Sequence, residues 1–331
     1  MSDWRIFKGD HEIRDQVILP PAPPWRDFQR AAEHRAMTFQ IGDEEIQLIN
    51  AAIYLRRPLL ITGAPGSGKS SLPYPLAYEL GLGSVLRWSI NSRSTLTEGL
   101  YHYDAIARLR DVSLSHSTVP QIQTQSNSQV VEGDVQHNIG DYLTLGPLGT
   151  ALLPCDRPRV LLIDELDKSD IDLPNDLLHV LEEGCFEIPE LLRIANKQPE
   201  VWLQPSGGSK DSDRVCIRGG VVQCREFPLV VITSNGECEM PAPFLRRCLR
   251  LRMPEPDAEK LSRIVQAHLG DVDAGAAGVL IQEFIEAREK GRLVATDQLL
   301  NAVFLVTNQR APSDQEWGSV RQVLLQALNE G

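Results

Sequence analysis

The segment that most constrains the fold is a short apolar run followed by a glycine-rich loop, at residues 59–70. The apolar residues predict a buried strand, and the loop after it has glycines at positions 63, 66 and 68, then Lys69 and Ser70. This spacing is G-x-x-x-x-G-K-[ST], in which flexible glycine backbones can turn successive N–H groups toward phosphate oxygens. The sequence therefore predicts a strand, a phosphate-binding loop and a helix, in that order.

The residue types in the loop have distinct expected roles. Lys69 would reach the β- and γ-phosphates as a point charge, and the Ser70 hydroxyl would ligate magnesium. The alternative is a glycine-rich connection with no ligand, but the flanking strand and helix patterns favour nucleotide binding. We expect the nucleotide to contact the whole loop, which consists of Gly63, Ala64, Pro65, Gly66, Ser67, Gly68, Lys69, Ser70 and Ser71.

A helix is predicted on each side of this strand and loop. Before them, apolar residues recur at helical spacing over residues 43–56. After them, the helix should run to about Leu80, with Gly81 as its stop. Pro73 and Pro75 each remove a backbone donor, so we expect a kink or a tightened first turn there.

A second strong pattern is an apolar strand that ends in two acidic residues. Four large apolar residues at 160–163 precede Asp164 and Glu165, which is typical of a parallel strand buried on both faces. Ligands of open α/β sheets bind beyond the carboxyl ends of the strands. Asp164 would bind magnesium, and Glu165 would orient and deprotonate the attacking water. The alternative is a simple helix cap, but the phosphate loop in the same chain favours catalysis.

Polar residues also follow two later elements. Asn235 comes after an apolar strand pattern at 228–232 and could hydrogen-bond the γ-phosphate or the attacking water. Alone, it would be interpreted as a turn residue before Gly236. Arg246 and Arg247 end a short predicted helix. Adjacent arginines usually form a solvated helix end, and the alternative is an arginine finger that reaches a neighbouring subunit's γ-phosphate.

The remaining core elements are predicted from shorter patterns. Residues 85–90 alternate as a strand, and the capping-box spacing of Thr95 and Glu98 predicts a helix with an apolar side from Leu96 to Ala107. The polar tract at 113–130 is expected to be a mobile loop. A helix is predicted from Asp172 to Gly184, and residues 185–227 are predicted as an insertion with a long hairpin.

The two ends of the chain differ from this core. Residues 1–38 are rich in proline and aromatic residues, and this arm either packs on the core or contacts a neighbouring subunit. Beyond residue 254 only helical patterns occur, which predicts a small all-helical domain. Its last helix should open with a capping box of Ser313 and Glu316.

Composition narrows the class of protein. Hydrophobic and charged contents of 42% and 24% are ordinary for a soluble globular chain, and no apolar run could span a bilayer. The six cysteines form no C-x-x-C pair, so reduced thiols in a cytoplasmic protein are expected. A net charge of −12 makes a nucleic-acid partner unlikely.

The order of these motifs resembles the AAA+ ATPase superfamily and, within it, the MoxR-type ATPases. Residues 63–70 match Walker A, Val160 to Glu165 match Walker B, Thr233 to Asn235 match sensor 1, and Phe244 to Cys248 match the helix that carries the arginine finger. The resemblance implies an αβα P-loop NTPase sandwich with a parallel sheet and a helical lid. The implied divisions are an arm at 1–38, an ATPase core at 39–253 with inserts at 91–150 and 185–227, and a lid at 254–331.

The resemblance also implies ligands, an assembly and a partner that the motifs alone do not indicate. It implies ATP and magnesium as ligands, a hexameric ring with ATP at the subunit interfaces, and remodelling of a partner protein, such as one with a von Willebrand A domain. Arg247 is the better arginine-finger candidate, with Arg246 beside it. No arginine stands at the lid position near Ala295, and Arg292 is the nearest candidate for sensor 2. The alternatives are an ATP-operated assembly switch with slow turnover and a DNA-acting AAA+ motor.

Overall fold

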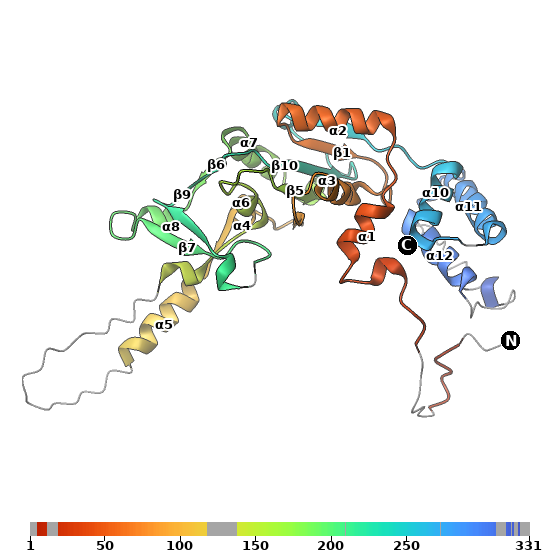
Figure 1. Cartoon of the computed structure of the whole chain (residues 1–331), viewed down its shortest axis with the longest axis horizontal. Helices are drawn as coiled ribbons and strands as arrows, with labels where there is room; N and C mark the ends of the chain where they lie inside the picture. The colour runs from red at the N-terminus through yellow and green to blue at the C-terminus, as the bar shows by residue number, and fades with distance from the viewer. Residues whose placement is uncertain are drawn as a thin grey trace, which may run out of the picture. The chain divides into compact units, whose positions relative to one another are not determined.

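The computed structural model describes most of the chain, namely residues 5–11, 19–117, 138–208, 210–271, 273–308, 316–318, 320 and 324. These residues belong to two compact units. Figure 1 shows their helices and strands. The first unit consists of residues 1–85, 231–239 and 248–331, and the second of residues 86–230 and 240–247. The loop predicted at 113–130 is wrong for residues 113–117, which belong to the helix Ala105–Ser117. Residues 118–130 and the predicted cap at Ser313 lie outside the described residues.

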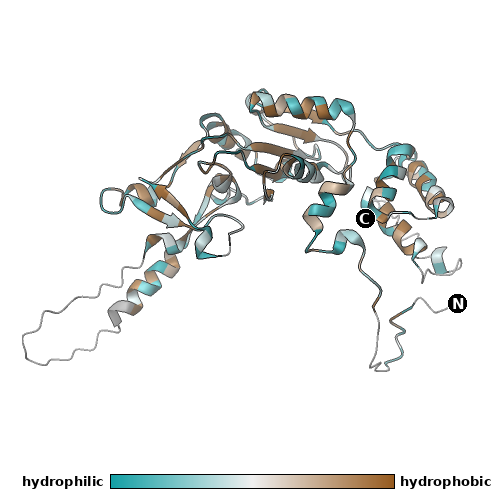
Figure 2. Ribbon diagram, viewed as in Figure 1, coloured by the Kyte–Doolittle hydropathy of each residue, from teal (hydrophilic) through white to brown (hydrophobic). Residues whose placement is uncertain are grey.

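The chain has an α/β fold built on a five-stranded sheet, as predicted. The strand order is β11-β1-β10-β5-β2. β1 pairs in parallel with β10 and β11, and β2 pairs in parallel with β5. The bounds are β1 Leu59–Thr62, β2 Leu86–Ser89, β5 Val160–Asp164, β10 Leu229–Ser234 and β11 Leu249–Arg252. β5 and β10 are buried along their whole length, and β1 and β10 are strongly hydrophobic in Figure 2.

Helices of the first unit come from both ends of the chain. They are α1 Ala31–Thr38, α2 Asp43–Leu55, α3 Pro73–Glu79, α10 Ala258–Leu269, α11 Ala274–Glu289 and α12 Thr296–Thr307. The C-terminal helices share a hydrophobic cluster that includes Leu261, Phe284 and Val303. Trp25, in the short 3₁₀ helix Pro24–Arg26, packs against this cluster. Around Trp25, the N-terminal arm is therefore packed on the first unit, which was one of its two interpretations.

The predicted tightening after the phosphate loop is confirmed. A 3₁₀ turn spans Lys69–Ser71, and the α-helix starts only at Pro73. Proline has no N–H to donate and is tolerated at the first helical position, so the α-helical ladder can begin there but not earlier. The helix ends at Glu79, and Gly81 has a φ of 60°, as expected of a stop.

The second unit contains smaller elements around β2 and β5. Its helices are α4 Leu96–Leu100, α5 Ala105–Ser117, α6 Pro147–Ala151, α7 Leu173–Glu183, α8 Pro189–Leu192 and α9 Ala242–Leu245. Its additional strands are β3 Tyr101–Tyr103, β4 Leu143–Leu145, β6 Cys185–Glu187, β7 Glu200–Leu203, β8 Val215–Arg218 and β9 Val221–Gln223. The predicted hairpin is present as β7 and β8, within a four-stranded sheet of order β6-β9-β8-β7.

One predicted helix is wrong. The capping box of Thr95 and Glu98 is present, but α4 ends at Leu100 instead of continuing to Ala107. The aromatic segment Tyr101–Tyr103 forms β3 and pairs antiparallel with β4. Aromatic residues favour strands, and the pairing with β4 outweighs the helical spacing of the apolar side chains.

None of the helices in the described part of the chain combines the length and apolar character needed to cross a bilayer.

Candidate functional site

The phosphate loop leaves the end of β1 in a conformation that only glycine adopts easily. Gly66 and Gly68 have φ of 74° and 88°. A Cβ on Gly66 would lie 2.5 Å from the Cβ of Ala295 and 2.8 Å from its Cα, at the start of α12. Within the first unit, the loop backbone therefore approaches the C-terminal helices more closely than a side chain at position 66 permits.

Lys69 is held beneath this loop. Lys69 is only 6% exposed. Its Nζ donates hydrogen bonds to the carbonyl oxygens of Gly63 at 2.7 Å and Ala64 at 2.8 Å. A buried ammonium is unfavourable unless it is hydrogen-bonded. The two carbonyl oxygens of the loop therefore stabilise the ammonium by hydrogen bonds. The loop is thus a positively charged cradle, which fits phosphate.

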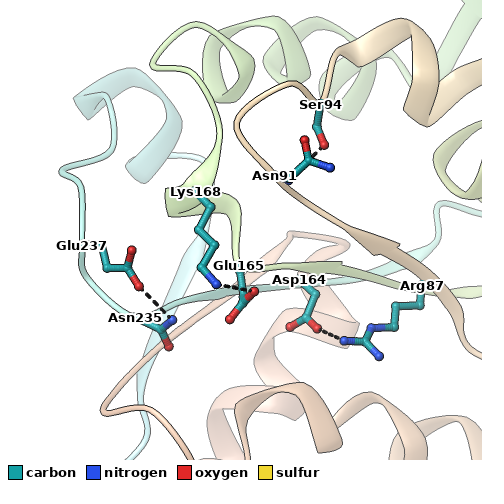
Figure 3. Close-up of polar contacts among 8 residues, drawn as sticks. All are labelled: Arg87, Asn91, Ser94, Asp164, Glu165, Lys168, Asn235 and Glu237. Atoms are coloured by element: carbon teal, nitrogen blue, oxygen red, sulfur yellow. Dashed lines mark hydrogen bonds and ion pairs between the residues drawn. The ribbon is translucent and has the colours of Figure 1, made fainter. Parts of the chain in front are cut away.

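Asn235 leaves the sheet beside the same loop. In the parallel pairing of β1 and β10, Thr62 lies opposite Ser234. The loop and Asn235 therefore start from paired positions at one edge of the sheet. The Asn235 amide donates to Oε1 of Glu237 at 3.4 Å (Figure 3). This placement is consistent with a sensor of the γ-phosphate, and that role stays a prediction.

A cavity of about 370 Å³ adjoins the loop within the first unit. One wall is the loop itself, including Ser67, and others come from α1, α10 and α12. Trp25 and Phe39 supply aromatic surface to the same cavity. Aromatic faces next to a phosphate loop suit the base of a nucleotide, because every base presents a π-face for stacking.

Three residues that line the cavity have a buried polar atom without a hydrogen-bond partner. Among the described residues, the Oγ of Ser67, the Nε2 of His34 and the Nδ1 of His268 are buried without a hydrogen bond. The two imidazole rings meet edge to face with centroids 4.9 Å apart. Burial lowers the pKa of both histidines, that of His268 to about 4, so His268 is neutral at pH 7. The cavity is thus lined partly by polar residues, next to the aromatic rings of Trp25 and Phe39.

Arg292, the candidate for sensor 2, also lies in the first unit. It lines a smaller cavity of about 110 Å³ together with Ala64 and Pro65 of the loop. The structure therefore places an arginine next to the phosphate loop, although no arginine stands at the expected position near Ala295. Its role as a sensor stays a prediction.

In the second unit, Asp164 is buried at the end of β5. It is 3% exposed, and its Oδ2 lies 2.6 Å from the Nη2 of Arg87 on the neighbouring strand β2 (Figure 3). Such a short contact is a charge-assisted hydrogen bond. The predicted magnesium ligand is therefore ion-paired within its own unit.

Glu165 differs from its neighbour in both backbone and surroundings. Its φ of 62° and ψ of 50° place it in the left-handed region, which is unusual for a residue other than glycine. The turn separates the two acidic side chains: Asp164 is buried, whereas the Glu165 side chain is 41% exposed and pairs with Lys168 at 2.9 Å. Backbone strain of this kind is concentrated at functional sites, which is consistent with the predicted catalytic role.

The two arginines follow α9 in the second unit. Arg247 pairs closely with Glu182 of α7, and both side chains are partly exposed. The hydrogen bond between them lowers the pKa of Glu182 and raises that of Arg247. Arg246 caps the end of α9. The pair with Glu182 holds Arg247 on the surface of its own unit, and an arginine-finger role stays a prediction for both residues.

The sequence patterns missed two features of the candidate site, namely Arg87 and the cavity lined by His34 and His268. Arg87 was visible as the only charged residue in the alternating strand pattern at 85–90, and its closeness to Asp164 required the parallel pairing of β2 with β5. His34 and His268 are far apart in the sequence, so no local motif marks the cavity that they line.

Comparisons with known proteins add little to this geometry. No protein-family model matches the chain, and no curated protein matches it. Among solved structures, the chain is similar to domain III of the replication initiation protein DnaA from Thermotoga maritima, with 16% sequence identity and a TM-score of 0.43. The match covers 89% of this chain and 98% of that one. A likeness this distant identifies neither a family nor a function.

Proposed function

We propose that the chain binds ATP with magnesium and hydrolyses it. The observation that supports this most is the glycine loop with Lys69 anchored beneath it, next to a cavity with aromatic walls in the same unit. A phosphate cradle and a neighbouring base cavity are the two parts that a nucleotide requires.

The proposed roles follow from charge and exposure. Lys69 exchanges neutral carbonyl acceptors for phosphate oxygens, which are better partners for a cation. Glu165, being partly exposed, is the residue able to accept a proton from an attacking water, and Asn235 would orient that water or the γ-phosphate. Each of these roles is one that phosphoryl transfer needs, because its catalysis is mainly positioning and charge stabilisation.

The sequence motifs give Ser70 and Asp164 as the proposed magnesium ligands, and phosphate oxygens would supply further ones. Among the described residues, no group of three or more His, Cys, Asp or Glu could hold a metal. Magnesium commonly binds through one or two carboxylates plus substrate phosphates, so the donors present fit that mode. When bound, the ion neutralises charge on the phosphoryl oxygens.

We further propose that hydrolysis drives remodelling of a partner protein by a ring of subunits of the AAA+, MoxR-type kind. The support is the sequence resemblance, together with two arginines that follow a short helix. In such a ring, Arg247 would leave Glu182 and act at a neighbouring subunit's nucleotide. Sedimentation of the full chain with and without ATP tests self-association, and a chain that stays monomeric with ATP would contradict this part of the proposal.

Nucleotide binding is tested with a fluorescent ATP analogue, displaced in turn by ATP, ADP and GTP. We expect saturable, magnesium-dependent binding to the wild-type chain and at least about a hundredfold weaker binding by Lys69→Met, since a charge-assisted contact to phosphate is lost. Lys290→Met is the matched control because Lys290, directly after α11, is exposed and forms an ion pair with Glu286 of that helix. Equal binding by all three proteins would contradict the proposal.

A further inference from the structure

The ion pair of Arg87 with Asp164 connects two neighbouring strands of the second unit. In the parallel register of β2 and β5, Ser89 lies opposite Asp164 and Arg87 lies opposite Leu162. Side chains two residues apart on a strand share a face, so Arg87 and Asp164 are diagonal neighbours on one face of the sheet. Figure 3 shows the guanidinium directed at the Asp164 carboxylate.

The two partners differ strongly in exposure. The Asp164 side chain is 4% exposed, whereas that of Arg87 is 46% exposed. A carboxylate buried this deeply needs a compensating charge or hydrogen bonds. Arginine stays protonated at every pH at which proteins fold, so Arg87 keeps a permanent positive charge next to Asp164.

We propose that Arg87 is a positioning residue that makes metal binding at Asp164 conditional on bound nucleotide. Two cations that share one carboxylate repel each other, and Arg87 therefore disfavours a free divalent ion at Asp164. The negative charge of a triphosphate offsets that repulsion, so the metal enters together with the nucleotide. This inference rests on the proposed function, because it takes Asp164 to be a magnesium ligand.

The test measures metal binding without nucleotide. Mn²⁺ replaces Mg²⁺ as the probe, and free Mn²⁺ is followed by electron paramagnetic resonance with the full chain. We expect the wild-type chain to bind Mn²⁺ weakly, and Arg87→Gln to bind it at least about tenfold more tightly because the repelling charge is gone. The gain should vanish in a double variant that also carries Asp164→Asn.

Two further variants keep the test decisive. Arg87→Met has a similar length and no charge, and it should show the same gain if Arg87→Gln is unstable. Arg218→Gln removes an exposed pair with Glu200 in the same unit and should leave Mn²⁺ affinity unchanged. Any one of three results would overturn the inference. They are a Mn²⁺ affinity within about twofold of wild type in the neutral Arg87 variants, a gain in affinity that survives Asp164→Asn, and failure of both neutral variants to fold.

Failure of the proposed function has a different signature. In that case the wild-type chain would not bind the fluorescent ATP analogue at any Mg²⁺ concentration. If wild-type protein binds the analogue with Mg²⁺ but Arg87 variants show unchanged Mn²⁺ affinity, the ATPase proposal stands and the role of Arg87 is refuted.

Discussion

The two units compensate a buried charge in opposite ways. In the first unit, Lys69 is stabilised by the neutral carbonyl oxygens of Gly63 and Ala64. In the second, Asp164 is stabilised by the full charge of Arg87. The two backbone carbonyls give the ammonium hydrogen bonds without adding a charge, whereas the guanidinium places a full positive charge next to the carboxylate.

This difference suggests a division of labour between the units. A lysine beneath a glycine loop can exchange carbonyl oxygens for phosphate oxygens, so the first unit should account for most of the nucleotide affinity. An aspartate paired with arginine should bind a metal only when the phosphates arrive, so the second unit should affect turnover more than affinity.

Glu165→Gln should separate hydrolysis from binding. Removing a general base typically slows the chemical step by about 10²- to 10⁴-fold, while the amide preserves the size of the side chain. We therefore expect steady-state ATP turnover to fall by that factor and affinity for the fluorescent analogue to stay within about threefold. The measurement is phosphate release under saturating ATP.

Glu187→Gln, on an exposed position of β6, is the matched control and should turn over ATP like the wild type. A wild-type chain with no measurable turnover would instead favour the assembly-switch function. Weakened nucleotide binding in Glu165→Gln would contradict the division between the two units.

Gly66→Ala should damage the first unit through its backbone. The added Cβ meets Ala295 at 2.5 Å, and the φ of 74° is itself unfavourable for alanine by about 1–2 kcal/mol. Gly83→Ala provides a matched control, because Gly83 has a φ of 79° but open space around its Cβ position. We expect Gly66→Ala to lower the free energy of unfolding by at least about 1 kcal/mol more than Gly83→Ala and to weaken nucleotide binding strongly. If the two substitutions lower the free energy of unfolding equally, the loop can shift away from Ala295 without cost, and the prediction is wrong.

Much of this architecture was predictable from local sequence. The strand and loop around Lys69, the buried strand before Asp164 and the tightened turn before Pro73 all depend on residues within one or two turns of each other. Such patterns are dictated by backbone sterics and burial, which the local sequence encodes.

The unpredicted features depend on long-range pairing. β3 forms in place of the predicted helix because Tyr101–Tyr103 pairs with a strand far along the chain, at Leu143–Leu145. The Arg87 pair requires two parallel strands, and the histidine pair requires α1 to meet α10. The left-handed turn at Glu165 was also missed, since no glycine or asparagine marks it.

The first unit should lose stability in mild acid. Burial lowers the pKa of His268 from 6.5 to about 4, so its contribution is fully present above pH 6.5 and is lost as the pH falls toward 4. From pH 7.5 to 5.5, we expect the free energy of unfolding to fall by about 1 kcal/mol, measured by denaturant titration. His34 shifts in the same direction.

His268→Phe keeps an aromatic ring and removes the titration, so it should flatten this pH dependence. The second unit should contribute little in that range. The pKa of Glu182 is lowered, and the stability it contributes is lost only as the pH falls below its ordinary value of 4.5. An unchanged pH dependence in His268→Phe would refute the assignment.

A glycine substitution at Glu165 tests whether the left-handed backbone there is strained. Glu165→Gly should raise the free energy of unfolding by about 1 kcal/mol, because glycine adopts a φ of 62° without the penalty that glutamate bears. The lost pair with Lys168 is exposed and contributes little. Glu165→Gln should show no such gain, which separates the backbone from the side chain. If glycine does not stabilise the protein, the left-handed conformation is relaxed, and the contrast between the units then depends on charge alone.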